Sequence, residues 1–198
     1  MSVLMRTTGV KQALGVVFLF FVSSCASFGA STIEKLDPLT SVTLTAVKTP
    51  MIFYRDNSGR AAYAKDFANL GPIQVNQSGR YRYFLWVGIW STGQESADTR
   101  RRDNFEEPVL YIDGEPFQLV LAGWTPESIG ASEGIYTKPV ASAIDAYYEV
   151  TPDVIRLLVQ ASDVRLRTGG IDGVSFEPWN DQQAARDSLK DFLELIAY

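Results

Sequence analysis

The segment RYRYFLWVGIW, residues 80–90, gives the strongest β-strand signal in the chain. Aromatic and β-branched residues dominate it, and successive side chains of a strand point to opposite faces. Odd-numbered residues, from Tyr81 to Ile89, would share one face, and even-numbered residues, from Arg82 to Trp90, the other. Both faces are apolar beyond Tyr83, which is typical of a strand that is covered on both sides. The pattern therefore predicts a sheet with this segment at its centre.

Weaker strand signals lie on both sides of this central segment. SVTLTAVK, residues 41–48, alternates apolar and polar positions, as a half-buried strand does. The Asp113-Gly114 pair stands between two apolar runs, VLYID and PFQLVLA, and predicts a β-hairpin. Residues 61–69 are ambiguous between a helical turn and a loop. Further strands are expected at residues 50–55, 72–75, 116–122, 135–139, 143–150, 164–168 and 173–178.

Two helices are expected in the C-terminal half of the chain. Thr151-Pro152-Asp153 supplies an N-cap, a proline at the first helical position and an acid in the first turn, which predicts a helix over residues 152–161. Apolar residues recur at helical spacing between Ala185 and Ile196, which predicts a second helix over residues 181–197. Because strands come first and helices follow, the sequence predicts a β-rich α+β fold: an antiparallel β-sandwich or bent sheet with two C-terminal-half helices.

The N-terminus has the three parts of an export signal. Arg6 and Lys11 precede the apolar stretch ALGVVFLFFV, and small residues then lead to Cys25, the single cysteine of the chain. The apolar stretch suits a signal-peptide core of about 7–15 residues and is too short for a membrane span of about 20. We therefore expect residues 1–24 to be a signal peptide, residues 25–40 a lipidated N-terminus and flexible tether, and residues 41–198 a single β-rich periplasmic domain.

The end of this signal, Val22-Ser23-Ser24-Cys25, resembles the lipobox of bacterial lipoproteins. The resemblance covers the signal alone and implies that Cys25 becomes the first residue of the mature chain, acylated through its thiol with chains such as palmitate. Ala26 resembles the type retained at the outer membrane. The implied location is the bacterial cell envelope, with the membrane contacted through the lipid on Cys25. The alternative is an ordinary secretory signal with a cysteine near its cleavage site.

Composition narrows the function further. Removing residues 1–24 leaves 174 residues with a formal charge of −7, because two of the 18 Lys and Arg residues are lost and none of the 23 Asp and Glu. An acidic chain lacks the basic footprint of a nucleic-acid-binding protein. The chain has no histidine, which argues against Ser-His-Asp and Cys-His catalysis and imidazole metal sites. We therefore expect no nucleic-acid partner, no cofactor, no metal and no catalytic activity.

Two segments are candidate binding surfaces. The aromatic residues of the central strand could line a groove for sugar, peptide or lipid, although packing in the core is the simpler explanation for them. Three consecutive arginines could bind phosphates of lipid headgroups or lipopolysaccharide, although flanking aspartates favour a solvated loop. The residues concerned are Tyr81, Tyr83, Phe84, Trp86 and Trp90 on the strand, and Arg100, Arg101 and Arg102 in the loop.

The leading hypothesis is a non-catalytic outer-membrane lipoprotein that binds or scaffolds another component of the envelope, with an envelope protein as its expected partner. One alternative is a carrier of lipid or lipopolysaccharide, which would need an apolar cavity open to the surface. The other is an envelope hydrolase that uses paired carboxylates, since such chemistry needs no histidine. Asp113 and Asp172 lie in predicted turns, where aspartate is common, so their presence does not require a catalytic role.

Overall fold

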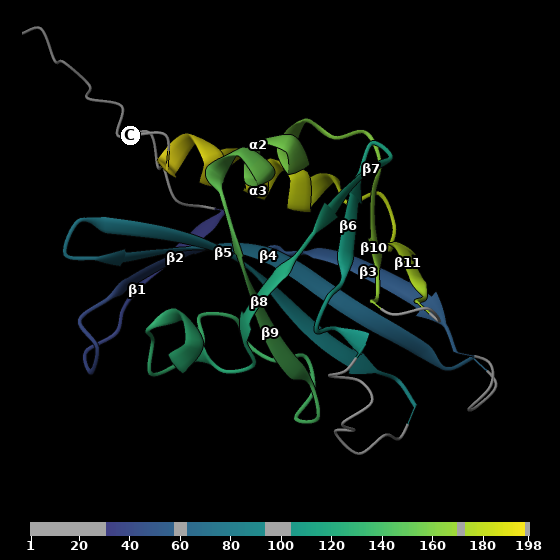
Figure 1. The fold of residues 1–198 in the computed structure, drawn as a ribbon, viewed down its shortest axis with the longest axis horizontal. Coiled ribbons are helices and arrows are strands. Elements are labelled where there is room, and N and C mark those ends of the chain that lie inside the picture. The colour runs from purple at the N-terminus through teal and green to yellow at the C-terminus, as the bar shows by residue number, and fades with distance from the viewer. Residues whose placement is uncertain (1–30, 58–62, 94–103, 170–172, 197–198) are drawn as a thin grey trace, which may run out of the picture.

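The computed structural model describes residues 31–57, 63–93, 104–169 and 173–196. Within these ranges the chain forms one antiparallel sheet of eleven strands (Figure 1). Nine strands follow one another in space in the order β7 (Glu115–Gln118), β6 (Val109–Ile112), β10 (Val164–Arg167), β11 (Ser175–Pro178), β3 (Met51–Asp56), β4 (Lys65–Gln77), β5 (Arg80–Ser91), β9 (Ile144–Val150) and β8 (Val120–Gly123). Two more lie beside them: β2 (Thr43–Val47) pairs with β4, and β1 (Thr32–Leu36) pairs with β2.

Helices α2 (Pro152–Gln160) and α3 (Gln183–Ile196) lie on the same side of the sheet (Figure 1). Thr151 has extended backbone at the N-cap of α2 and Pro152 opens the helix, as the sequence predicts, but the Thr151 side chain makes no capping hydrogen bond. The β-rich α+β class with two helices in the C-terminal half is therefore confirmed. Among the residues that the structure describes, no helix is both long and apolar enough to cross a membrane.

The middle of β5 is buried on both faces, because the sheet separates two hydrophobic cores. Leu85, Val87 and Ile89 face the larger core, which lies on the helix side and includes Ile155 of α2 and Phe192 of α3. The even-numbered residues of β5 face the other way. The central position of residues 80–90, with β4 on one side and β9 on the other, is confirmed.

The smaller core lies on the opposite face of the sheet. It contains Phe84 and Trp86 of β5, together with Ile129 from the 3-10 helix η1 (Pro126–Ile129). The ring of Tyr136 stacks on Trp86 with 4.3 Å between ring centroids. The strand expected at residues 135–139 is absent from the structure. This segment instead places the Tyr136 side chain against the smaller core.

The sheet bends until it is nearly closed, and Leu119 makes this possible. The sequence predicted one strand over residues 116–122, whereas the structure divides it at Leu119 into β7 and β8. The Leu119 side chain is buried, and its backbone N–H donates to the carbonyl of Pro108 at 3.0 Å. β7 then pairs with β6, and β8 pairs with β9, so consecutive strands occupy the two ends of the strand order.

The long strand β4 changes neighbours halfway along its length. It pairs with β3 up to Leu70 and with β2 from Ile73 onward, so Gly71 and Pro72 have no registered partner on that edge. This gap accommodates a proline, which has no N–H for a ladder. The expectation of a helical turn or a loop over residues 61–69 is wrong from Lys65 onward, because β4 begins there and continues through the expected strand at residues 72–75. Residues 61 and 62 lie outside the described residues.

Regular structure begins before Ser41, inside the segment expected to be a tether. Residues Thr32–Leu36 form β1, which pairs with β2 along its whole length. Ile33 packs against the smaller core, and Lys35 forms an ion pair with Glu133 at 2.7 Å. These contacts tie the segment to the domain. Residues 1–30, which include the expected signal peptide and Cys25, lie outside the described residues.

Candidate functional site

The structure divides the aromatic residues of β5 among three environments. Phe84 and Trp86 are buried, and Trp86 Nε1 donates to Asp145 Oδ1 at 3.0 Å. Tyr81 is 54% exposed and Tyr83 is half-buried, and both lie at the start of the strand. Trp90 is half-buried at its other end. These residues therefore do not form one continuous surface, and the two ends of β5 must be considered separately.

The remaining predicted site residues cannot be placed. Arg100, Arg101 and Arg102 lie outside the described residues, as do Cys25 and the three residues before it.

A polar surface continues from the larger core at the Tyr81 end of β5. Its side chains come from the same face of four neighbouring strands, because residues two apart on a strand share a face. The strand register places one row of four residues across the sheet: Glu34, Thr45, Gln74 and Tyr83. It places a second row beside the first: Leu36, Thr43, Asn76 and Tyr81.

The C-terminal end of α3 lies over this surface and turns it into a groove of about 430 Å³. Ala185, Leu189 and Phe192 fix the helix by packing in the larger core, so the helix end has a defined position above the sheet. We use "the groove" for the space lined by Glu34, Thr43, Thr45, Gln74, Asn76, Tyr81, Tyr83, Leu195 and Ile196. Its volume lies in the range of about 300–1,000 Å³ that is usual for ligand sites.

Most polar side chains of the groove keep their hydrogen-bonding capacity for a ligand or water. Between lining residues the structure records one side-chain hydrogen bond, from Gln74 Nε2 to Tyr83 Oη at 3.4 Å. Asn76 Oδ1 accepts from the backbone N–H of Gly79 at 2.9 Å, which leaves its amide NH₂ available. Glu34 is the one carboxylate among the lining residues, and no lysine or arginine belongs to them. The groove is thus polar, aromatic and weakly acidic.

Asp37 holds the turn that follows β1, the strand that supplies Glu34 to the groove. Its buried carboxylate accepts hydrogen bonds from the backbone N–H and the hydroxyl of Ser132. It also accepts from the backbone N–H of Leu39 at 3.0 Å and of Thr40 at 3.3 Å. The backbone hydrogen bond from Ser132, aided by the others, holds the pKa of Asp37 far below its usual range despite burial. The charged carboxylate therefore joins the end of β1 to the segment that contains Ser132.

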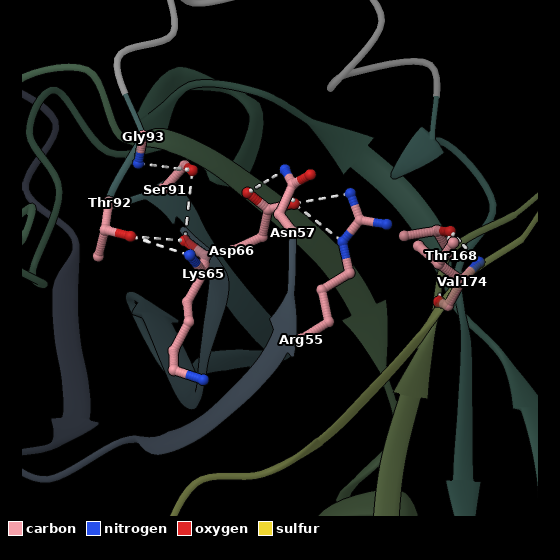
Figure 2. A network of polar contacts seen from close by, with 9 residues as sticks. All are labelled: Arg55, Asn57, Lys65, Asp66, Ser91, Thr92, Gly93, Thr168 and Val174. Atoms are coloured by element: carbon pink, nitrogen blue, oxygen red, sulfur yellow. Dashed lines mark hydrogen bonds and ion pairs between the residues drawn. The ribbon is translucent and has the colours of Figure 1, made fainter. Parts of the chain in front are cut away.

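The opposite end of the β4–β5 pair has a different polar arrangement, shown in Figure 2. Asp66 accepts a hydrogen bond from Arg55 Nε at 2.8 Å, and an ion pair joins Arg55 Nη2 to the same oxygen at 2.6 Å. Asn57 Nδ2 donates to both carboxylate oxygens, at 2.9 and 3.1 Å. Thr92 and Lys65 exchange two further bonds, from each backbone N–H to an oxygen of the other residue, at 2.9 Å. These contacts fix the ends of β3, β4 and β5.

The electrostatics of Asp66 agree with a structural role. Burial raises its pKa, but hydrogen bonds from Asn57, Ser91 and Arg55 and the charge of Arg55 outweigh burial, so the pKa is lowered. A lowered pKa keeps the carboxylate charged at neutral pH, where it is fully engaged by its partners. These contacts hold the strand ends together, and the described polar side chains of this network have little free hydrogen-bonding capacity.

Trp90 belongs to an aromatic cluster on the outer face of the same end. Its ring stacks on Phe67 with 4.3 Å between centroids, and Trp179 meets Phe67 edge-on at 5.5 Å. Lys65 Nζ lies 4.8 Å from the centroid of the Tyr54 ring. The aromatic rings are largely occupied by one another and by the lysine, so this cluster is closed compared with the groove.

Several acidic residues have structural partners. Asp113 Oδ1 accepts the backbone N–H groups of Ser162 and Asp163, both at 2.9 Å, and so joins the β6–β7 turn to the segment before β10. Arg165 contacts Asp163 at 3.1 Å and Glu177 at 3.5 Å. In the part of the chain that the structure describes, no three His, Cys, Asp or Glu residues gather as a metal site would require.

The sequence carries a signal for the groove in the segment that forms the second half of β4. Gln74 and Asn76 alternate with Ile73 and Val75, which is the pattern of a strand with one polar face. Residues 41–48 show the same alternation, which predicts a half-buried strand but by itself indicates no function. What the sequence could not supply was the register that places these residues opposite Tyr81 and Tyr83.

Comparison of the chain with protein-family models, with curated proteins and with solved structures finds no match. The function must therefore be inferred from the groove itself.

Proposed function

We propose that the protein is a non-catalytic, lipid-anchored binding protein of the bacterial cell envelope, held at the periplasmic side of the outer membrane through Cys25. The observation that supports this proposal is the groove, in which four paired strands present hydroxyl, amide and aromatic groups with few hydrogen-bond partners among the described residues. Binding sites combine a few well-placed polar groups with aromatic surface on a rigid scaffold in this way.

The short connection between Cys25 and β1 supports a role close to the membrane. Seven Cα–Cα steps separate Cys25 from Thr32, and an extended chain of that length reaches at most about 25 Å. β1 also supplies Glu34 to the groove. A lipid on Cys25 would therefore keep the groove near the bilayer, where an envelope component held at the membrane is accessible to it.

Two other functions receive less support from the geometry. A lipid carrier needs an apolar cavity deep enough to enclose an acyl chain, whereas the larger core beneath the helices consists of packed side chains. The more apolar hollow of about 470 Å³, which lies beside β7, β9 and the start of α2, is a wide surface depression. A carboxylate-dependent hydrolase needs two acidic residues about 5–10 Å apart across its cleft. Glu34 is the one acidic residue among those that line the groove. The groove is better suited to binding than to either of these activities.

Photo-cross-linking in cells tests this function. A photoreactive phenylalanine analogue at position 81, in the otherwise native chain, should capture one envelope component in high yield. The same analogue at position 63 is the matched control, because Tyr63 is also an exposed tyrosine, at 93%, and does not line the groove. Cys25→Ala should release the protein from the membrane fraction and reduce the capture. Equal capture from positions 81 and 63, or unchanged membrane association of Cys25→Ala, would contradict the proposal.

A further inference from the structure

We infer that the ligand of the groove is a neutral saccharide chain of the envelope. This inference rests on the proposed function, because it takes the groove to be the binding site, and it adds the chemical class of the ligand.

The position of the groove on a sheet face argues against a peptide ligand. Extended peptides are usually bound by adding a strand to a free sheet edge, where backbone N–H and C=O groups are unpaired. In the groove, the backbone of β2 is paired on both sides, and so is that of β4. The outer edge of β1 has no partner strand among the described residues, but a ligand that lies across the face of β2 and β4 meets side chains, and these suit a ligand that is itself rich in hydroxyl groups.

The charge of the groove argues against anionic ligands. Phosphates and acidic sugars are normally bound by arginine, lysine or a helix N-terminus. The groove contains one carboxylate, Glu34, no cationic side chain among its lining residues, and the C-terminal end of α3. A helix C-terminus carries partial negative charge, so both features repel anions. The lining therefore selects for a neutral ligand or one with an amine.

The arrangement of the side chains matches a chain of sugar rings. Tyr81 offers an exposed aromatic face for stacking on the apolar face of a sugar. Gln74 and Asn76 offer amides that donate and accept together, as neighbouring sugar hydroxyls require. Each row crosses four strands, so it extends about 14 Å at about 4.8 Å per strand spacing. That length accommodates more than one sugar ring, which favours an oligosaccharide over a single sugar.

Apolar contacts in the groove are limited to its edge. Leu195 and Ile196 come from the end of α3, whereas the floor consists of polar and aromatic side chains. An acyl chain would leave the threonine and amide groups of the floor without hydrogen-bond partners, which is costly. The same groups form hydrogen bonds with a saccharide.

Isothermal titration of the full lipidated protein tests the inference. The detergent should have no sugar headgroup, for example lauryldimethylamine oxide, because a glycoside detergent would compete. The probes are two neutral oligosaccharides, chitotetraose and maltotetraose, together with inorganic phosphate. We expect saturable binding of at least one neutral oligosaccharide and none of phosphate.

Variants then locate the binding. Tyr81→Ala and Gln74→Leu should each weaken the affinity about tenfold, the effect of losing one stacking or hydrogen-bonding contact worth about 1.4 kcal/mol. Tyr81→Phe should retain most of the affinity, because it keeps the ring, and Tyr63→Ala should retain all of it. The inference would be overturned if neither oligosaccharide binds. It would also be overturned if the affinity is the same in the native protein, in Tyr81→Ala and in Gln74→Leu.

Failure of this inference can be distinguished from failure of the proposed function. Selective cross-linking from position 81, without binding of either oligosaccharide, would reject the saccharide and leave the anchored binding protein in place. Membrane association that is independent of Cys25, with no selective cross-linking, would reject the proposed function itself.

Discussion

The two ends of the β4–β5 pair use polar residues in opposite ways. At one end, Asp66 is bonded to Arg55 and Asn57, and the strand ends are fixed by further hydrogen bonds (Figure 2). At the other end, Gln74 and Tyr81 face an open groove and have few partners within the protein. The comparison shows that the number of internal partners, more than the type of residue, separates polar groups that stabilise the fold from those available to a ligand.

The largest effect is expected when the Asp66 end is disrupted. Asp66→Ala should lower the free energy of unfolding by about 2–3 kcal/mol, because it leaves Arg55 without its counter-charge in a largely covered position. Breaking a fully buried ion pair costs about 3–5 kcal/mol, and the 31% exposure of the Arg55 side chain reduces that cost. Urea unfolding of the two proteins measures the difference.

Asp56→Ala is the matched control for this variant. Asp56 pairs with Lys65 on the adjacent position of the same strands, but its side chain is 71% exposed. Its loss should cost less than about 1 kcal/mol. Equal destabilisation by both substitutions would show that the Asp66 network has no special role in stability.

A second effect is expected at the point where β4 changes partner between the two ends. A Cβ atom at Gly71 would lie 2.2 Å from Tyr136 Oη, so Gly71→Ala must displace the ring that covers Trp86. It would also break the hydrogen bond from Tyr136 Oη to the Pro72 carbonyl, which measures 2.9 Å. Overpacking of this kind costs about 1–3 kcal/mol, to be measured by urea unfolding.

A double variant examines the cause of this loss. If the collision with Tyr136 is responsible, Gly71→Ala should cost much less in a Tyr136→Ala background than in the native chain. Strictly additive losses would mean that the glycine is required for another reason.

The third prediction concerns the loss of folding stability at low pH. The pKa values of Asp66 and Asp37 are lowered in the folded protein, so both residues stabilise it above the pKa of about 3.9 that aspartate has in an unfolded chain. This stabilisation should be lost as the pH falls below about 4 and through the folded pKa values. Unfolding midpoints in urea between pH 6 and pH 2 should fall with pH, and Asp66→Asn should make the dependence shallower. An unchanged dependence would contradict the role of the charged Asp66.

The smallest effect on stability is expected in the groove. Tyr81→Ala should change the free energy of unfolding by less than about 0.5 kcal/mol, because the side chain is 54% exposed and outside both cores. The same substitution should weaken ligand binding, as argued above. A large loss of stability in urea unfolding would place Tyr81 among the structural residues and remove the contrast between the two ends.

Local patterns in the sequence were sufficient for the centre of the fold. The alternation in residues 80–90 predicted a strand buried on both faces, and Asp113-Gly114 predicted the hairpin of β6 and β7. Pro152 and the apolar spacing before Ile196 predicted the two helices. Each of these features depends on residues close together in the chain.

Features that depend on distant segments could not be predicted in the same way. Gly71-Pro72 resembles a strand break, and only the change of partner from β3 to β2 explains how β4 continues through it. Trp86 and Trp90 share one face of β5, but Tyr136 stacks on Trp86, so their burial differs for reasons that lie in another segment. The groove likewise requires the register of four strands and the position of α3.

The most direct test of the contrast between the two ends is NMR mapping of backbone amide shifts while chitotetraose or maltotetraose is added to the full lipidated protein. We predict shifts that saturate at Gln74, Asn76 and Tyr81 and no shifts at Asn57 and Asp66. Saturable shifts centred on the Asp66 end, or no shifts with either oligosaccharide, would contradict the assignment of the groove as the saccharide-binding end of the protein.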